Sequence, residues 1–461
     1  MKIAIIKHKN ISLSSHRIDP SFHLSDAIRC REDLLNLPFE NISIKDVSES
    51  VFIGNIFSRT FVKDKDHGMA YLAASDTVLS NINTGKFLSK KQAEKLKYLQ
   101  LQKDWILITC SGTLGNVTYT NCNFENKIAT HDLIRVIPSD KILRKGVLYA
   151  LLSSKFGYYQ LTQSSFGGVV KHINASQVLN VQFPIFPENF QRNIDNLVQQ
   201  SAILREKASC ELSNAIEEIT QYIAISGIGD IKNTFSSKSV NISKIYNSLN
   251  TRLDPTVYNN NAIDHLNNSK LPYKKLSECD VKIWYPGIFK RAYVKTGIPY
   301  IKGSSLFNVN PFRSCDYLSR TRTPMLEQLW LKEGQILMTC AGLCGQVKLI
   351  TKEYEEKEAI GSPDIIRIQS NDSLFTSQYL FAYLQVPFVV DFMQSLKYGS
   401  VIERFDAEHA GTIPIVEPTP ELSSKITSII SNYMDCTYKA FKAEEEAIYM
   451  VEAEIEKWNK H

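Results

Sequence analysis

The chain contains one sequence pattern twice. Residues 87–115 (FLSKKQAEKLKYLQLQKDWILITCSGTLG) align without a gap with residues 317–345 (YLSRTRTPMLEQLWLKEGQILMTCAGLCG), at a constant shift of 230. That period is too long for the repeat unit of a solenoid, which spans roughly 20–50 residues. The pattern therefore predicts two copies of a whole domain, which could present two similar surfaces to a target with two similar halves.

The match continues on both sides of this segment. Four further pairs of segments correspond: RIDP at 17–20 with RLDP at 252–255, IFSRTFVK at 56–63 with IFKRAYVK at 288–295, DLIR at 132–135 with DIIR at 364–367, and FGGVV at 166–170 with YGSVI at 398–402. The shift stays between about 229 and 235. We therefore expect the insertions to be small and to lie in loops.

Each copy ends at a proline-rich stretch that is followed by a long amphipathic segment. Apolar residues recur at steps of three and four over residues 188–224 and again over 421–458. Such length favours a helix that packs on another helix, so we expect an antiparallel coiled coil with pseudo-two-fold symmetry. The alternative is that each helix packs on its own domain.

The predicted fold class is α+β, with two similar mixed α/β domains, each followed by a long helix. The predicted boundaries are residues 1–187 for the first domain, 188–225 for the central helix, 226–418 for the second domain and 419–461 for the C-terminal helix. Two such units fill the chain.

Local patterns predict the elements of each copy. In the first copy we expect a strand within residues 1–10, a helix over 89–100 with Ser89 as its N-cap, strands over 105–109, 116–120 and 131–137, a glycine turn over 111–115, and a helix over 146–164. In the second copy we expect a strand over 330–339 and a helix over 378–396.

Charge is distributed unevenly along the chain. Residues 1–187 carry 23 Lys and Arg against 15 Asp and Glu, and residues 226–418 carry 22 against 19. Both helical segments are acidic, with 3 basic against 6 acidic residues over 188–225 and 5 against 8 over 419–461. A basic domain suits nucleic acid, although solvated lysines would give the same count.

Cysteine usage and hydropathy exclude several classes of protein. The nine cysteines include no CxxC pair, which favours reduced thiols in a cytoplasmic protein over disulfides or a zinc site. The histidines show no ligand spacing, so we expect neither a metal nor a cofactor. No run of 18 apolar residues is present, so a membrane span is not expected.

Motifs for catalysis are missing from the sequence. Gly112-Thr113-Leu114-Gly115 follows a strand and precedes another strand, so tight-turn glycines are a better interpretation than a phosphate loop. The pair Pro363-Asp364 lacks the downstream Glu-x-Lys that a nuclease site would need. We therefore expect no catalytic residue.

The remaining candidates are side chains for binding DNA. Arg and Lys suit guanine edges and phosphates, and polar side chains beside turn glycines suit base edges. The candidates are Arg59, Lys63, Lys65, Lys86, Lys90, Ser111, Thr113, Lys171 and His172 in the first copy, and Lys290, Arg291, Lys295, Arg313, Arg320, Arg322, Lys397 and Arg404 in the second. For each of them the alternative is a solvated surface charge.

The whole pattern resembles the specificity subunit of Type I restriction–modification systems. The resemblance rests on the doubled Arg-[Ile/Leu]-Asp-Pro openings, the IF-x-R-x-[F/Y]-VK segments, the strand and turn at 106–117 and 336–347, and the FPIFP stretch before Gln191 and Ile194. The second copy departs from the family pattern, since it has AGLCG in place of SGT-x-G and no glutamine at the matching helix start.

The resemblance implies a non-catalytic subunit. Each globular copy would be a target-recognition domain that reads one half of a bipartite double-stranded DNA site. The helices would separate the domains and dock methyltransferase subunits and, through them, a restriction subunit. The alternatives are a DNA-recognition subunit of another methylation-based defence system, a standalone DNA-modifying enzyme, and a protein–protein scaffold.

Overall fold

The computed structural model describes residues 37–163, 172–225, 239–246, 249–253, 255–258, 262–269, 271–399, 401 and 403–459, with the isolated residues 6, 23, 30, 33 and 34. The chain divides into two compact units. Unit 1 comprises Met1–Glu206 and Lys439–His461, and unit 2 comprises Lys207–Tyr438. Each unit therefore contains part of both long helices, α9 (Glu188–Ile225) and α19 (Pro420–Lys457). The predicted N-terminal strand lies outside the described residues.

A four-stranded antiparallel sheet forms the centre of unit 1. Its strands are ordered β2 (Ser48–Ile53), β9 (Leu133–Pro138), β6 (Ile106–Thr109) and β7 (Val117–Tyr119). All four residues of β6 are buried, as the apolar run predicts. One face of the sheet packs against the helices α6 (Lys145–Ser153), α7 (Lys155–Gln163), α9 and α19 in a single apolar core.

A second sheet and a short ribbon complete unit 1. The second sheet is ordered β3 (Phe61–Val62), β5 (Phe87–Ser89), β4 (Gly68–Leu72) and β8 (Ile128–Ala129), and only its β4–β8 pair is parallel. The ribbon pairs β1 (Asn41–Ser43) with β10 (Gln182–Pro184). Short helices connect these strands: α4 (Ile44–Val47), η1 (Lys65–His67), η2 (Ala74–Val78), α5 (Lys90–Lys95), η3 (Lys97–Leu99), η4 (Cys122–Phe124) and α8 (Ala175–Leu179).

Unit 2 repeats this topology strand for strand. Its main sheet is ordered β12 (Val281–Trp284), β19 (Ile365–Ser370), β16 (Ile336–Thr339) and β17 (Val347–Leu349). Its second sheet is ordered β13 (Tyr293–Val294), β15 (Asp316–Leu318), β14 (Ile298–Ile301) and β18 (Ile360–Gly361), and its ribbon pairs β11 (Tyr273–Lys275) with β20 (Pro414–Val416). The duplication in the sequence is therefore a duplication of the domain.

Helices connect the strands of unit 2 as well. They are α10 (Ile242–Tyr246), η5 (Leu249–Thr251), α11 (Pro255–Tyr258), α12 (Ala262–Ser269), η6 (Leu276–Glu278), α13 (Gly303–Leu306), α14 (Leu326–Leu329), α15 (Lys352–Glu356), α16 (Ser377–Tyr383), α17 (Pro387–Ser395) and α18 (Ala407–Gly411). The strand predicted over residues 330–339 is shorter than expected, because a turn occupies residues 333–334 and regular pairing starts only at Ile336.

The single helix predicted over residues 146–164 is in fact two helices, and so is the one predicted over 378–396. In unit 1 the break falls at Ser154, whose backbone is extended and whose Oγ accepts a hydrogen bond from Gly157 N at 3.2 Å. In unit 2 the break precedes Pro387, which can start a helix but cannot continue one. Ser89 does occupy the N-cap of α5, although its side chain makes no capping hydrogen bond.

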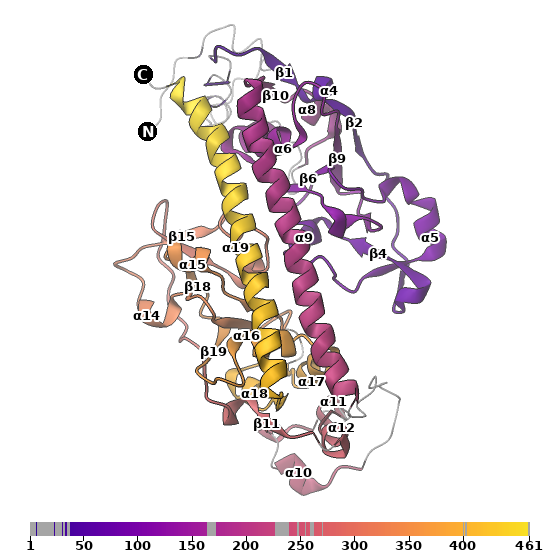
Figure 1. Cartoon of the computed structure of the whole chain (residues 1–461), viewed down its shortest axis with the longest axis vertical. Helices are drawn as coiled ribbons and strands as arrows, with labels where there is room; N and C mark the ends of the chain where they lie inside the picture. The colour runs from indigo at the N-terminus through magenta and orange to yellow at the C-terminus, as the bar shows by residue number, and fades with distance from the viewer. Residues whose placement is uncertain are drawn as a thin grey trace. The chain divides into compact units, whose positions relative to one another are not determined.

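The two long helices run antiparallel, as predicted (Figure 1). In unit 1 Trp458, just beyond the end of α19, stacks edge-on against Phe39 at 5.9 Å, and Phe39 contacts Phe186 just before α9 begins. In unit 2 the hydroxyl of Tyr222 near the end of α9 donates to the carbonyl of Glu417, which precedes α19. The predicted pseudo-two-fold relation stays a prediction.

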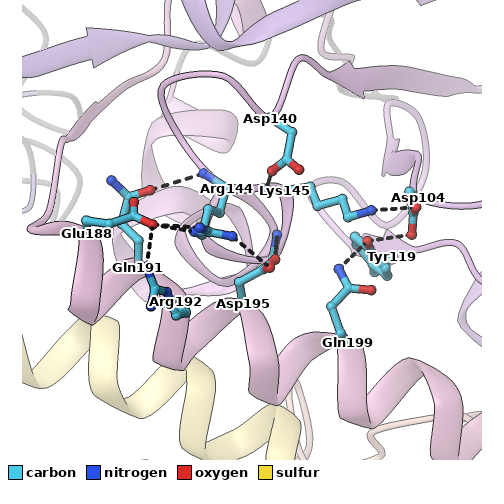
Figure 2. Close-up of polar contacts among 11 residues, drawn as sticks. Asp104, Tyr119, Asp140, Arg144, Lys145, Glu188, Gln191, Arg192, Asp195 and Gln199 are labelled. Atoms are coloured by element: carbon cyan, nitrogen blue, oxygen red, sulfur yellow. Dashed lines mark hydrogen bonds and ion pairs between the residues drawn. The ribbon is translucent and has the colours of Figure 1, made fainter.

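Polar contacts attach the main sheet and α6 of unit 1 to α9 (Figure 2). Asp195 on α9 accepts a hydrogen bond from Gly146 N at 2.8 Å, and so satisfies a free donor in the first turn of α6. Arg144 pairs with Glu188 at 2.6 Å, and its backbone N–H donates to Gln191. These contacts fix the position of α6 against α9 in unit 1.

None of the described helices combines the length and the apolarity that crossing a membrane requires.

Candidate nucleic-acid interface

In each unit a tight connection joins the third and fourth strands of the main sheet. We call it the hairpin loop, residues 110–116 in unit 1 and 340–346 in unit 2. Thr109 closes the first one, since its Oγ1 donates to Thr113 O at 2.5 Å and accepts from Asn116 N at 3.0 Å. Thr339 makes the same two contacts in unit 2, with Leu343 O and Gln346 N.

The glycines of the hairpin loops have the role that the sequence predicts. Gly112 and Gly115 have φ of 70° and 76°, and Gly342 and Gly345 have φ of 71° and 80°. Side chains with a Cβ rarely adopt this left-handed region, so the glycines permit the turn. The turn exposes Thr113 in unit 1 and Leu343 in unit 2, which are different chemical groups at the same place.

A second segment lies beside each hairpin loop. We call it the closing segment, residues 172–173 in unit 1 and 404–405 in unit 2. Ile173 N donates to Cys110 O at 3.1 Å, and Phe405 N donates to Cys340 O at 2.9 Å. These bonds bring His172 next to Ser111 and Arg404 next to Ala341. His172 and Arg404 therefore occupy equivalent positions.

The other candidates near the closing segments have different environments. Lys397 forms an ion pair with Glu403, and the neighbouring Tyr398 pairs through its backbone with Arg404. Arg404 itself is exposed. Lys171 lies outside the described residues. The structure thus brings Ser111 and His172 together in unit 1, and groups Lys397 with Arg404 in unit 2.

An arginine follows the first strand of each main sheet. We call this stretch the arginine loop, residues 54–60 in unit 1 and 286–292 in unit 2. Arg59 Nε donates to the Tyr71 hydroxyl at 2.6 Å, and its NH2 group lies 3.8 Å from Asp132. Its guanidinium also lies 5.7 Å from the centre of the Tyr71 ring.

The arginine loop of unit 2 reproduces this arrangement. Arg291 Nε donates to the Tyr300 hydroxyl at 2.7 Å, and its NH2 group pairs with Asp364 at 3.0 Å. Burial opposes the charge of Arg291, but the bonds to Tyr300 and Asp364 raise its pKa above the ordinary value. The two arginines are therefore held in a fixed direction by contacts within their own units.

A buried arginine donates hydrogen bonds to the backbone around each of these aspartates. Arg135 is fully buried and donates to the carbonyls of Leu133, Ala129 and Thr130 at 3.0–3.1 Å. Arg367 makes the matching bonds to the carbonyls of Ile365, Gly361 and Ser362. Burial lowers the pKa of each guanidinium to about 10, so both are charged at neutral pH. Each one braces the turn that carries Asp132 or Asp364.

The remaining basic candidates fall into two groups. Two of them are occupied: Lys86 pairs with the buried Asp76 at 2.9 Å, and Arg320 pairs with Glu358 at 2.5 Å. The other seven are exposed, Arg313 among them. The remaining six have no ion pair with any described residue: Lys63, Lys65, Lys90, Lys290, Lys295 and Arg322. The six are the side chains most available to phosphate.

The residues that sequence reasoning missed are the partners of the arginines. Tyr71 and Tyr300 lie 12 and 9 residues beyond their arginines, whereas Asp364 lies 73 residues beyond Arg291 and Asp132 is equally far from Arg59. The sequence did contain a signal for these partners, because each of them recurs in the other copy.

Among the described residues no three His, Cys, Asp or Glu side chains form a group that could hold a metal ion. The arrangement can donate hydrogen bonds and positive charge to an anionic surface.

Part of the chain matches a known protein family. Residues 36–202, a little over a third of the chain, match the family described as Type I restriction modification DNA specificity domain. A comparison with curated proteins gives no match.

Two solved structures align with most of the chain. The chain is 13% identical to the S subunit of a Type I restriction–modification system from M. genitalium, with 92% of this chain and 96% of that one covered and a TM-score of 0.35. It is 14% identical to the HsdS subunit from Thermoanaerobacter tengcongensis, with 92% and 97% covered and a TM-score of 0.27.

The family match falls on the domain of unit 1, and unit 2 repeats the strand order of that domain. On this evidence residues 36–202 match a Type I restriction modification DNA specificity domain, and the chain contains a second domain with the same strand order.

Proposed function

We propose that the chain recognises a bipartite double-stranded DNA sequence, with each unit reading one half. One observation carries this proposal: the two units share a frame but present different side chains from it. The hairpin loops offer Ser111 and Thr113 in unit 1 against Ala341 and Leu343 in unit 2, and the closing segments offer His172 against Arg404. Two domains with the same fold and different exposed loop side chains suit a target with two different halves.

Electrostatics supports DNA as the target of both units. Lys290 and Lys295 flank the held Arg291 without an ion pair to any described residue, and Lys63 and Lys65 follow Arg59 in the same way. Such lysines can bind phosphates and set the position of the protein on the duplex, while the tips of the loops read bases. Lys86 and Arg320 are less available to DNA, because each pairs with an acidic side chain of its own unit.

We further propose that the chain acts in a complex and has no catalytic site or cofactor of its own. Methyltransferase subunits, and a restriction subunit through them, would dock along the acidic faces of α9 and α19. The acidic excess of residues 188–225 and 419–461 supports a role for these helices that does not involve DNA. The cytoplasm is the compartment that a DNA-modifying complex with free thiols requires.

The test is to express the chain with its methyltransferase partner and to sequence the methylated bases. We expect one bipartite sequence with a fixed spacer, and nuclease protection of the same sequence by the purified complex. His172→Ala should alter the base preference in one half, and Arg404→Ala should alter it in the other. Protection of all sequences alike, or a change in both halves from one variant, would overturn the proposal.

Two alternatives give different results in the same preparations. A standalone enzyme would show metal-dependent or S-adenosylmethionine-dependent turnover of DNA by the isolated chain. A protein–protein scaffold would show DNA binding without a steep salt dependence. An affinity that depends on contacts with several phosphates falls by orders of magnitude as salt rises from about 50 to about 200 mM.

A further inference from the structure

An isoleucine is exposed at the same place in both units. Ile56 in the arginine loop of unit 1 is 86% exposed, and Ile288 in the arginine loop of unit 2 is 70% exposed. We propose that these two side chains make apolar contacts with DNA bases, one in each half of the target. The inference rests on the proposed function and assigns specificity-determining residues to it.

The arginine loop holds its isoleucine on a rigid support. In unit 1 the next residue, Phe57, packs against the buried cluster that contains Tyr71 and Leu99. Gln92 bonds to the loop on both sides of Arg59, since its Nε2 donates to Ser58 O and its Oε1 accepts from Thr60 N at 2.8 Å. In unit 2 the matching Phe289 packs against the cluster around Tyr300 and Leu329. A supported tip loses little conformational entropy when it binds.

Comparison of the two copies separates structural residues from unexplained ones. The loops read NIFSRT at 55–60 and GIFKRA at 287–292, so they share only Ile, Phe and Arg. The phenylalanine is shared because it fills the core, and the arginine because Tyr and Asp hold it. The isoleucine contributes little to either core. A single exposed apolar side chain is ordinary, but the same one at both equivalent sites indicates contact with a partner.

The surroundings of the isoleucines indicate that this partner is DNA. In unit 2 Ile288 lies within eight residues of Lys290, Arg291 and Lys295, and that stretch of chain contains no acidic residue. A half-exposed aromatic ring follows in each unit, Phe61 at 51% and Tyr293 at 52% exposure. Apolar tips among cations suit DNA, because an isoleucine can contact a thymine methyl group or wedge into a base step while lysines bind phosphates.

The charge around the equivalent loop of unit 1 is more mixed. Lys63 and Lys65 alternate with Asp64 and Asp66, and Asp64 accepts a hydrogen bond from Asp66 N at 2.8 Å. The net attraction for phosphate is therefore weaker there than in unit 2. We expect the apolar contact of Ile56 to make a larger fractional contribution to its half-site, since less of the affinity comes from charge.

The experiment uses the full chain in complex with its methyltransferase partner. The probe is duplex DNA of the sequence found methylated, together with duplexes in which one half or the other is scrambled. The variants are Ile56→Ala and Ile288→Ala, with Ile56→Val and Ile288→Val as conservative changes. Ile142→Ala in unit 1 and Ile263→Ala in unit 2 are matched controls, since both side chains are exposed isoleucines outside the arginine loops.

We expect each alanine variant to lower the affinity for the target about tenfold, in the range of one lost base contact. The loss should vanish when the half that this unit reads is scrambled, and the valine and control variants should bind as the parent does. Replacing thymines by deoxyuridine, which lacks the methyl group, should reproduce the loss at one position if the contact is to a methyl. A fluorescent base analogue should report unstacking if the contact is a wedge.

Three outcomes would overturn the inference. The first is unchanged affinity in both alanine variants while the parent still prefers its target, and in this case the proposed function stands. The second is that the alanine variants bind the methyltransferase more weakly in the absence of DNA, while their DNA affinity is unchanged. The third is that the variants change the self-association of the chain, again with unchanged DNA affinity. If the parent complex itself has no sequence preference, the proposed function fails and the inference fails with it.

Discussion

We expect substitution of the buried arginines Arg135 and Arg367 to lower the stability of their own units strongly. Arg135→Met removes a fork that donates to three carbonyls and leaves those acceptors buried without a donor. At roughly 1 kcal/mol for each lost bond, we expect the free energy of unfolding of unit 1 to fall by about 3 kcal/mol. Urea unfolding measures it. The matched control is Arg192→Met, an exposed side chain on α9, which should change stability by less than about 0.5 kcal/mol. Equal effects from both would contradict the prediction.

Buried thiols should make the chain sensitive to alkaline pH. Burial, together with the nearby carboxylates of Asp132 and Asp364, raises the pKa of Cys110 and of Cys340 to about 11. The unfolded thiol titrates near pH 8.5. A raised folded pKa means that the contribution to stability is complete below about pH 8.5 and is lost as pH rises toward 11.

The measurement compares urea midpoints at pH 8 and pH 10.5, and Cys340→Ala should reduce the difference between them. At pH 8 a thiol reagent followed by mass spectrometry should label the exposed Cys210 well before Cys110 or Cys340. Labelling of all three at the same rate in the folded chain would refute the assignment of protonated, protected thiols.

For single residues, the sequence predicted which side chains are candidates for binding DNA but not which residues of the chain they contact. Arg59 and Arg291 were expected to face DNA from their position in a shared basic motif. The structure shows each held by a tyrosine and an aspartate, because β4 and the turn before β9 fold back beside the arginine loop. The aspartates lie 73 residues from their arginines, and a local sequence pattern does not specify a contact over that separation.

Among the elements, the junction of α6 with α9 is a close approach between two helices that can be tested. A Cβ added at Gly146 would lie 2.5 Å from Asp195 Oδ1 and 2.8 Å from Asp195 Cα, so the two helices would have to separate. We expect Gly146→Ala to lower the stability of unit 1 by about 2 kcal/mol, as overpacked contacts do. Gly303→Ala is the control, since a Cβ there meets nothing within 4 Å. Hydrogen exchange of α6 gives the readout, and protection equal to that of the parent would show that the junction adapts.

The same junction shows where sequence comparison loses register. Aligned by sequence, the FPIFP stretch at 183–187 matches residues 413–418, but the ribbons pair Asn41 with Pro184 and Tyr273 with Val416. The structural shift is therefore 232 there, which aligns Gln191 with the buried Ser423. Ser423 Oγ donates to Leu374 O at 2.5 Å, so the second unit has a polar anchor where a missing glutamine was inferred. Proline spacing alone could not fix this register.

For the whole molecule, the fold class was predictable because a duplication with two terminal amphipathic helices admits few arrangements. The division of each helix between the units was not. Residues Ala447, Val451 and Ile455 of α19 belong to the core of unit 1, although unit 2 precedes them in the chain. No periodicity in a helix says which of two similar cores it will complete.

This division predicts an effect confined to one unit. Val451→Asp places a charge in the core of unit 1 and should destabilise that unit by more than about 3 kcal/mol. Tyr449→Asp on the exposed face of α19 is the control. Hydrogen exchange should rise in β6 of unit 1 and stay unchanged in the equivalent β16 of unit 2. A rise in both strands would show that the two units unfold as one.

Because unit 1 is assembled from two separated stretches of chain, its folding during synthesis has an order imposed on it. Residues 1–206 emerge first, yet their core lacks the α19 residues until the ribosome has also made all of unit 2. Unit 2 is one continuous stretch and can close as soon as it leaves the exit tunnel. Unit 1 therefore cannot complete its core before unit 2 has been translated, although most of unit 1 precedes unit 2 in the chain.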